Sequence, residues 1–168
     1  MNANSKRRFE DKIAIVTGAG KGIGEQIAWD LSMEGATVIL VDIDNANIVS
    51  LKERIESGGG KCLTLQCDVS SSQQVEKMVN LSLDNFGKID LLVNNAGILI
   101  TGELDDVTDE LLDKMLDINL KGVIYLSRSV APIMKKSNYG RIVNIASICG
   151  MRGDNSTVPC YGASKGGV

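Results

Sequence analysis

Five short apolar runs alternate with longer stretches of helical hydrophobic spacing, and this alternation constrains the fold more than any other feature. The runs are predicted strands at Lys12–Thr17, Thr37–Val41, Leu63–Gln66, Ile89–Val93 and Arg141–Ala146. Strands that alternate with helices of about ten or more residues are typical of βα repeats, which form a parallel sheet with helices on both faces. The run TVILV is apolar throughout, as expected for a strand covered on both faces. We therefore predict an α/β domain with a doubly wound parallel sheet.

Helix signals fill the stretches between these runs. Ser70 and Gln73 fit a capping box that begins the helix after the third run. Thr108 begins a longer helix, which we expect to continue in segments to about Lys135. Because ligands of parallel α/β sheets bind beyond the carboxyl ends of the strands, the residues that follow each run are the candidates for function.

Composition and charge exclude several classes of protein. The formal net charge is −3, and a mildly acidic chain offers no basic stripe that could bind the phosphate backbone of a nucleic acid. We therefore expect no nucleic-acid partner. No apolar run approaches the roughly 18 residues of a membrane span, so we expect no membrane partner. The basic run Lys6-Arg7-Arg8 lies in residues 1–9, which we predict to be a flexible tail ahead of a single domain at residues 10–168.

Histidine is absent from the chain, and its four cysteines, Cys62, Cys67, Cys149 and Cys160, show no CxxC spacing. Zinc sites that use imidazole and nucleophiles activated by histidine are therefore excluded, and we predict no metal site. Scattered thiols are typical of reduced cysteines, which fits a cytoplasmic location. Any proton transfer must use other side chains.

A glycine-rich turn follows the first run, with the spacing Gly18-xxx-Gly22-x-Gly24. Glycine permits positive φ and the close approach of a pyrophosphate, and the N-terminus of the next helix offers free N–H groups to phosphates. A glycine turn can also be simple punctuation between a strand and a helix. Asp42, at the end of the second run, favours a dinucleotide site, because a carboxylate there accepts hydrogen bonds from the hydroxyls of an adenosine ribose.

The same two segments bear on the choice between NAD and NADP. The Asp42 carboxylate would repel a 2′-phosphate, which favours NAD. Lys21 acts in the opposite sense, because an ammonium group in the glycine turn could neutralise either Asp42 or a 2′-phosphate. We expect NAD as the cofactor, with NADP as the alternative; a solvated acid at a strand end is the alternative reading of Asp42.

Polar side chains also follow the three remaining runs. Asp68 comes after the third run, Asn94 and Asn95 come after the fourth, and Ser147 comes after the fifth. Asn and Asp are common in turns, so each residue alone is as compatible with turn formation as with ligand binding. Their coincidence at one edge of the predicted sheet favours a site.

Tyr161 and Lys165 are four residues apart, which places the phenol and the ammonium group one turn apart on a helix. A free tyrosine has a pKa of about 10, and a fixed nearby cation favours the phenolate and lowers that pKa. Tyr161 is therefore a candidate acid/base in a chain without histidine. This spacing occurs by chance in many helices, and the glycine turn and Ser147 are what strengthen it.

Taken in this order, the motifs resemble those of the short-chain dehydrogenase/reductase family. The resemblance covers residues 12–167 and rests on TGAGKGIG, the pair Asp68-Val69, NNAG, Asn119, Ser147 and YGASK. It implies a Rossmann-type fold.

The resemblance also implies roles around the cofactor. The phosphates and ribose would be lined by Gly18, Lys21, Gly22, Ile23 and Gly24. Asp42 would select at the adenosine ribose, while Asp68 and Val69 would contact the adenine and Asn95 would lie beside the adenosine. Asn94 would chiefly support the end of the sheet.

For the reaction, the resemblance implies that Tyr161 is the general acid/base and that Ser147 hydrogen-bonds the substrate oxygen. Lys165 would bind the nicotinamide ribose and lower the pKa of Tyr161. Asn119 would hold a water that links Lys165 to solvent, although its amide could also be a tolerated polar group in the long helix. The implied function is hydride transfer between NAD(P) and a secondary alcohol or ketone, such as a 3-oxoacyl thioester, a sugar or a polyol. A catalytically inactive fragment or an NAD(H)-binding module is the alternative.

The chain departs from the family at its C-terminus, because it ends at Val168, directly after the YxxxK motif, where family members continue. It is therefore either part of a longer enzyme or a true fragment. Without the further strands, we expect the fifth run to form an exposed edge on which Ile142, Val143 and Ile145 are incompletely buried.

The helix that begins at Thr108 resembles one that family members pair across subunits. Its apolar residues Leu112, Met115 and Leu116 could therefore face a neighbour in a homo-dimer or homo-tetramer. An intramolecular core is the equal alternative.

Overall fold

The computed structural model of the chain describes residues 7–152 and 156–168. Residues 1–6 of the expected tail lie outside this description. Two of the described residues of that tail, Arg8 and Phe9, are held on the domain. The Phe9 N–H donates to the Glu34 carbonyl at 3.0 Å, and Arg8 pairs with the Glu34 carboxylate at 2.8 Å. The Phe9 ring packs against the core.

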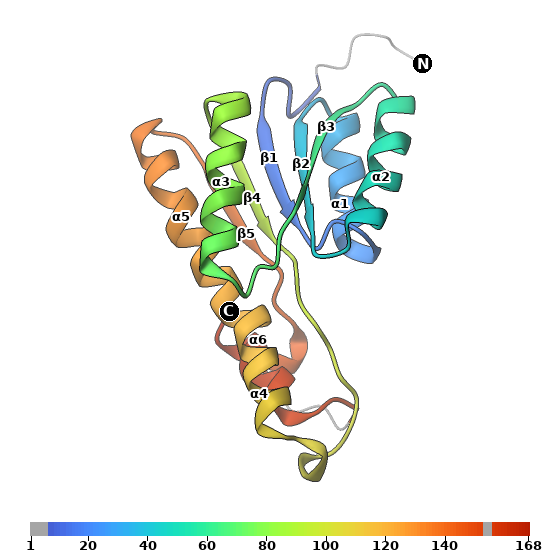
Figure 1. The fold of residues 1–168 in the computed structure, drawn as a ribbon, viewed down its shortest axis with the longest axis vertical. Coiled ribbons are helices and arrows are strands. Elements are labelled where there is room, and N and C mark those ends of the chain that lie inside the picture. The colour runs from blue at the N-terminus through green and yellow to red at the C-terminus, as the bar shows by residue number, and fades with distance from the viewer. Residues whose placement is uncertain (1–6, 153–155) are drawn as a thin grey trace.

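A five-stranded parallel sheet in the order β3-β2-β1-β4-β5 forms the centre of the fold (Figure 1). The strands are β1 (Ile13–Thr17), β2 (Thr37–Asp42), β3 (Lys61–Gln66), β4 (Leu91–Asn94) and β5 (Arg141–Asn144). All four pairings are parallel. The predicted parallel α/β sheet is therefore confirmed, and the strand order reverses between β1 and β4, where doubly wound sheets bind ligands.

Helices cover both faces of the sheet (Figure 1). Helices α1 (Gly22–Met33) and α2 (Asn45–Ser57) pack on the face that carries Ala14, Val38 and Leu40. Helices α3 (Ser72–Phe86) and α5 (Gly122–Lys136) pack on the opposite face, which carries Ile15 and Ile39. Successive strand residues point to opposite faces, so a strand covered on both sides must be apolar throughout, as TVILV is.

The long helix predicted from Thr108 is present in segments. Thr108 Oγ1 accepts the Leu111 N–H at 3.2 Å and caps α4 (Asp109–Leu116). A π-helical turn, η2 (Asp117–Lys121), then joins α4 directly to α5. Among residues 7–152 and 156–168, no helix has both the length and the apolar character needed to cross a membrane.

A smaller unit lies beyond the carboxyl ends of the strands, where α4 and α6 (Pro159–Gly166) lie together (Figure 1). The short 3₁₀ turns η1 (Leu104–Asp106) and η3 (Ile148–Gly150) complete it. Met115 of α4 is fully buried there against Val158, Cys160 and Tyr161 of the same chain. Met115 therefore faces an intramolecular core and not a neighbouring subunit.

The predicted cap of α3 was wrong by one residue. Ser71 is the cap, and its Oγ accepts the Gln74 N–H at 3.4 Å. Ser70 lies in the turn before the helix, where its N–H and its hydroxyl both donate to Asp68 Oδ1, at 2.9 and 2.7 Å. The Asp68 side chain thus forms the turn that precedes the helix.

Strand β5 forms the expected exposed edge. The side chains of Ile142 and Val143 are 37% and 50% exposed, whereas Val93, the partner of Val143 in β4, is 7% exposed. Ile145, just beyond the strand, is partly buried against the face of α1 and α2.

Candidate active site

The glycine turn after β1 places bare backbone at the mouth of a cavity. Gly18 and Gly22 have φ of +63° and +61°, which L side chains rarely adopt. Apart from Gly22 itself, its chain neighbours and the adjacent backbone of α1, no heavy atom lies within 4 Å of the position that a Gly22 Cβ would occupy, so the backbone of Gly22 faces open space. Gly24 is required for packing instead, because a Cβ there would collide with the Gly18 carbonyl oxygen and with Asn95 Nδ2.

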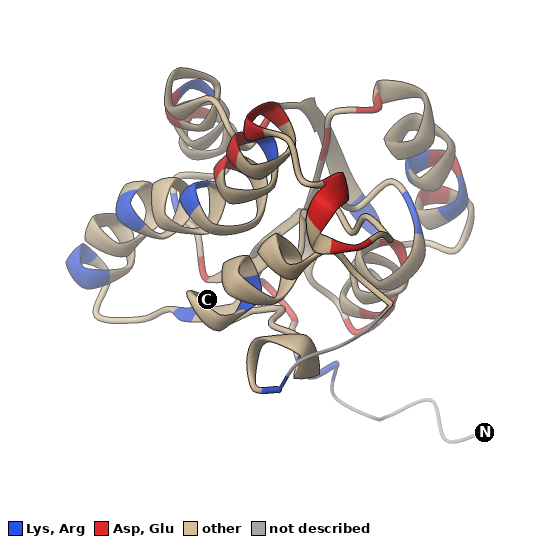
Figure 2. Ribbon diagram, turned by 90° about the horizontal axis from the view of Figure 1, so that it is seen from below, with Lys and Arg blue, Asp and Glu red and all other residues tan. Residues whose placement is uncertain are grey.

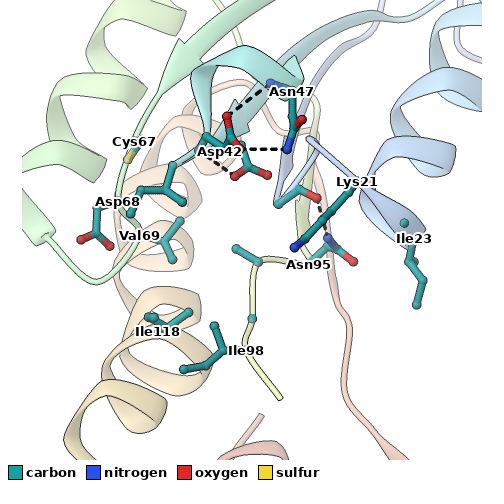
Figure 3. A pocket seen from close by; sticks show the side chains of 16 residues that line it. Lys21, Ile23, Asp42, Asn47, Cys67, Asp68, Val69, Asn95, Ile98 and Ile118 are labelled. Atoms are coloured by element: carbon teal, nitrogen blue, oxygen red, sulfur yellow. Dashed lines mark hydrogen bonds between the residues drawn. The ribbon is translucent and has the colours of Figure 1, made fainter. Parts of the chain in front are cut away.

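A cavity of about 670 Å³ lies between this turn and the ends of β2, β3 and β4 (Figure 3). Eight of the predicted cofactor residues line it: Gly18, Lys21, Gly22, Ile23, Asp42, Asp68, Val69 and Asn95. Its volume is in the range of pockets that hold small molecules and cofactors. Gly24, the remaining member of the glycine motif, lies behind the lining in the packed part of the turn.

Asp42 ends β2 with its carboxylate held by two backbone groups. Oδ2 accepts the Gly20 N–H at 2.9 Å, and Oδ1 accepts the Asp44 N–H at 3.0 Å. Figure 3 shows this side chain at the cavity wall, near Asn47. An ionised carboxylate offers about four lone-pair sites, so acceptor capacity remains for a ligand.

The end of β4 is fastened to the glycine turn. Asn95 Nδ2 donates to the carbonyl oxygens of Thr17 and Gly18, at 2.9 and 3.1 Å. Thr17 Oγ1 accepts the N–H groups of Asn95 and Ala96 and donates to the Val93 carbonyl at 3.2 Å. Sequence reasoning missed Thr17, although a hydroxyl at the last strand position before the turn was a usable signal.

Asn94 serves the sheet and does not line the cavity, in agreement with the support role expected of it. It is 2% exposed, and its Nδ2 donates to Ser127 Oγ at 3.1 Å and to Asn144 Oδ1 at 2.9 Å. These bonds tie the end of β4 to α5 and β5.

Tyr161 and Lys165 lie one turn apart on α6 and are 9% and 8% exposed. Lys165 Nζ donates to the Ile145 carbonyl at 2.6 Å. Burial lowers the pKa of Lys165, because the charged ammonium loses solvation.

Ser147 is half-buried and caps η3, where its Oγ accepts the Cys149 N–H at 3.2 Å. The cavity lining includes neither Ser147 nor Tyr161 nor Lys165. The structure therefore gathers eight of the predicted cofactor residues in one cavity and places Ser147, Tyr161 and Lys165 in the adjoining unit.

Asn119 lies in the π turn and is fully buried. Its Oδ1 accepts the Ile98 N–H at 2.8 Å, and its Nδ2 donates to the Ile98 carbonyl at 2.9 Å and to Ser164 Oγ at 3.0 Å. The side chain thus fastens the loop after β4 to the helix that carries Tyr161 and Lys165. π turns are frequent at functional sites.

Gly97 connects the cavity with that helix. It lines the cavity, and a Cβ there would lie 3.2 Å from Asn119 Oδ1 and 3.7 Å from Lys165 Nζ. Sequence reasoning missed several other lining residues: Ile43, Asp44, Asn47, Cys67, Ala96, Ile98 and Ile118. Most adjoin predicted strand ends, but Ile118 comes from the π turn and carried no signal.

Residues 12–168 match the sequence model of the short chain dehydrogenase family. The chain belongs to this family. It is 38% identical over 161 residues to a 3-oxoacyl-[acyl-carrier-protein] reductase of Thermotoga maritima. That match covers 96% of this chain and 65% of the reductase.

Solved structures of the family share the fold. A NAD⁺-bound xylitol dehydrogenase is 34% identical with a TM-score of 0.90, and the match covers 95% of this chain and 62% of that enzyme. A metagenomic short-chain oxidoreductase in complex with NADP is 34% identical with a TM-score of 0.89, at 95% and 72% coverage. The chain thus spans roughly two thirds of the short-chain dehydrogenases with which it is compared.

Proposed function

We propose that this chain is the cofactor-binding and proton-transfer part of an NAD-dependent oxidoreductase that interconverts a secondary alcohol and a ketone. One observation carries the proposal: Gly97 lines the cavity, and a Cβ built on Gly97 would lie only 3.7 Å from Lys165 Nζ. A ligand that fills the cavity from Asp42 to Gly97 therefore ends beside the helix of Tyr161 and Lys165.

The residues present fit a dinucleotide. The open space at Gly22 lies at the N-terminus of α1, where free N–H groups and the helix dipole favour phosphate. Asp42 offers acceptors to ribose hydroxyls at one end of the cavity, and Lys165 offers a donor near the other. A nicotinamide dinucleotide needs these three features: exposed backbone for its phosphates, an acceptor for one ribose and a donor for the other.

In the proposed reaction, a nicotinamide held in this cavity would supply or accept the hydride at the substrate carbon. Tyr161 donates its hydroxyl proton to the ketone oxygen in reduction and accepts a proton from the alcohol in oxidation. Ser147 would hold the same oxygen by a hydrogen bond, and the Lys165 ammonium would hold the nicotinamide ribose. Asn119 holds a water that carries protons between Lys165 and solvent.

We assign NAD as the cofactor because the Asp42 carboxylate would repel a 2′-phosphate. Lys21, exposed at the cavity, is the group that would favour NADP. Relatives use both: the xylitol dehydrogenase structure contains NAD⁺, and the metagenomic oxidoreductase structure contains NADP. Binding of both nucleotides to the wild-type chain and to Asp42→Ala tests the assignment; we expect the preference for NAD to be lost in the variant.

The proposed substrates are a 3-oxoacyl thioester or a sugar or polyol, the classes that the names of the Thermotoga reductase and of the xylitol dehydrogenase contain. The test is a panel of such ketones and alcohols, followed through the absorbance of the reduced nicotinamide. We expect turnover with the wild-type protein and its loss in Tyr161→Phe, with NAD binding retained. Turnover at a similar rate in Tyr161→Phe would contradict the acid/base assignment.

An NAD(H)-binding module without turnover is the second candidate, and it is favoured by the absence of Ser147, Tyr161 and Lys165 from the cavity lining. Nucleotide binding without turnover of any compound in the panel would support it.

We further propose a cytoplasmic homo-oligomer. The four cysteines all lie among the described residues and form no disulfide, as expected in a reducing compartment. Ile124 on α5 is 51% exposed, and Leu112 and Leu116 on α4 are only half-buried, so apolar surface remains for a second subunit. Light scattering distinguishes a dimer or tetramer from a monomer.

A further inference from the structure

Gly20 lies directly behind the Asp42 carboxylate, outside the cavity lining. Its φ is not positive, so its backbone conformation does not explain a glycine there. Space does: a Cβ on Gly20 would lie 2.9 Å from Asp42 Oδ2, 3.1 Å from Asp42 Cγ and 2.9 Å from Asn47 Cβ. Such contacts are closer than real Cβ atoms tolerate, so either the carboxylate or the helix start would have to move.

The surroundings leave little freedom for that movement. The Ala19 N–H donates to the Val41 carbonyl at 3.1 Å and pins the turn to β2. Asn47 sits in the first turn of α2, where Asp44 Oδ1 caps the helix and Asp44 Oδ2 accepts from Asn47 Nδ2 at 3.0 Å. The carboxylate of Asp42 is therefore the group that a side chain at position 20 would displace.

We infer that Gly20 is a positioning residue for cofactor choice: its N–H and its missing side chain fix the Asp42 carboxylate. This inference rests on the proposed NAD site. With one lone pair of each oxygen held by Gly20 and Asp44 N–H groups, the remaining pairs are fixed in place for two ribose hydroxyls. A displaced carboxylate would bind those hydroxyls less well and would repel a 2′-phosphate less strongly.

The test measures dissociation constants for NAD and NADP by calorimetry, in the wild-type chain, Gly20→Ala, Asp42→Ala and the double variant. We expect the ratio of the NADP constant to the NAD constant to fall about tenfold in Gly20→Ala, the size of one lost hydrogen bond to a charged group. Because Gly20 acts through Asp42, adding Gly20→Ala to Asp42→Ala should change the ratio no further.

Gly59→Ala is the matched control. Gly59 follows the far end of α2 and has φ of +81°, with nothing within 4 Å of its Cβ position. This change strains the backbone without touching Asp42, so it should lower stability and keep the wild-type ratio.

Hydrogen exchange gives a second measurement, which does not require Gly20→Ala to fold. The Gly20 amide should be protected in the wild-type chain and exchange faster in Asp42→Ala, which lacks its acceptor. A Gly20 amide that exchanges equally fast in both chains would contradict the hydrogen bond by which Gly20 holds the Asp42 carboxylate.

Failure of this inference differs from failure of the proposed function. Suppose that Asp42→Ala abolishes the preference for NAD, and that Gly20→Ala weakens the binding of NAD and NADP equally or not at all. Gly20 then has only a structural role, and the NAD proposal stands. If the wild-type chain binds neither nucleotide, or Asp42→Ala keeps the preference, the proposed cofactor choice is wrong and this inference falls with it.

Discussion

At the scale of single residues, buried polar side chains join the cofactor cavity to the expected catalytic helix. Ser164 is fully buried; its Oγ donates to the Tyr161 carbonyl at 2.8 Å and accepts from Asn119 Nδ2 at 3.0 Å. It thereby links α6 to the π turn, whose Asn119 holds Ile98. Loss of the Ser164 hydroxyl would leave the buried Asn119 Nδ2 donor without this acceptor, which costs stability.

We predict that Ser164→Ala lowers the free energy of unfolding by about 1–3 kcal/mol in urea denaturation. Ser82→Ala is the matched control, because Ser82 is also fully buried but its hydroxyl bonds only within its own helix, to Met78. We expect a smaller loss for Ser82→Ala. Equal losses would show that the link from Ser164 to Asn119 contributes nothing.

One buried thiol, that of Cys67, and one partly buried thiol, that of Cys62, make the free energy of unfolding depend on alkaline pH. Burial raises the pKa of Cys67 to about 11 and that of Cys62 to about 11, from an ordinary value of 9.0. The unfolded chain releases these protons at lower pH than the folded chain, so the free energy of unfolding falls as pH rises from about 9 toward 11. Lys165, whose pKa burial lowers, acts in the opposite sense, and the comparison must therefore be between variants.

We predict that Cys67→Ala reduces this fall, measured by urea denaturation at about pH 8 and about pH 10.5. Val79→Ala, a buried residue of the same cluster, is the control and should keep the wild-type pH dependence. A pH dependence unchanged in Cys67→Ala would contradict the raised pKa.

At the scale of elements, the two faces of the sheet and the order of strands and helices followed from apolar periodicity. Boundaries followed less well. β4 begins at Leu91, two residues after the predicted start at Ile89. At Asp90 a side chain takes part in the pairing with β1: Asp90 Oδ2 accepts the Ile13 N–H at 2.9 Å, while the Asp90 N–H donates to the Ile13 carbonyl at 2.9 Å. The α3 cap is Ser71, one residue later than predicted, and Ser70 belongs to the turn that its hydrogen bonds to Asp68 form. Long-range and side-chain bonds of this kind leave no periodic trace in a sequence.

The candidate site was predictable where it lies directly at a strand end and less so elsewhere. Asp42 and Asn95 were found in that way and do line the cavity. Ile118 and the two bonds between Asn119 and Ile98 depend on the π turn, and helical spacing gives no sign of the extra residue.

We predict that a Val→Ala substitution lowers the free energy of unfolding more in β4 than in its neighbour β5. Val93 and Val143 are register partners, but only Val93 is covered. We expect Val93→Ala to cost roughly 2 kcal/mol and Val143→Ala under about 1 kcal/mol in urea denaturation. Equal costs would show that β5 is covered in solution, for example by a second subunit.

At the scale of the whole molecule, two large apolar clusters flank the sheet, and a third, smaller cluster of Met115, Val158, Cys160 and Tyr161 supports the unit of α4 and α6. Lys and Arg are spread over several helices together with Asp and Glu (Figure 2). Gly97 lines the cavity between the sheet and the smaller unit, and a Cβ built on it would lie 3.7 Å from Lys165 Nζ, which is not itself part of the lining.

We predict that the amides of α6 exchange with solvent faster than those of β1 and β2, because fewer buried apolar side chains hold the smaller unit. Addition of NAD should slow the exchange of α6 if the nucleotide reaches Lys165. Hydrogen exchange with and without NAD provides the measurement, and β2, buried on both faces, is the internal control. Exchange in α6 as slow as in β1 would contradict the prediction.

The central claim is that one bound dinucleotide spans the cavity from Asp42 to the helix of Tyr161 and Lys165. A crystal structure of the chain soaked with NADH tests it most directly. We predict that the adenosine ribose hydroxyls lie within hydrogen-bond distance of the Asp42 carboxylate and that the nicotinamide ribose lies on Lys165 Nζ, beside Tyr161. A nicotinamide ring bound far from both Tyr161 and Lys165 would contradict the claim.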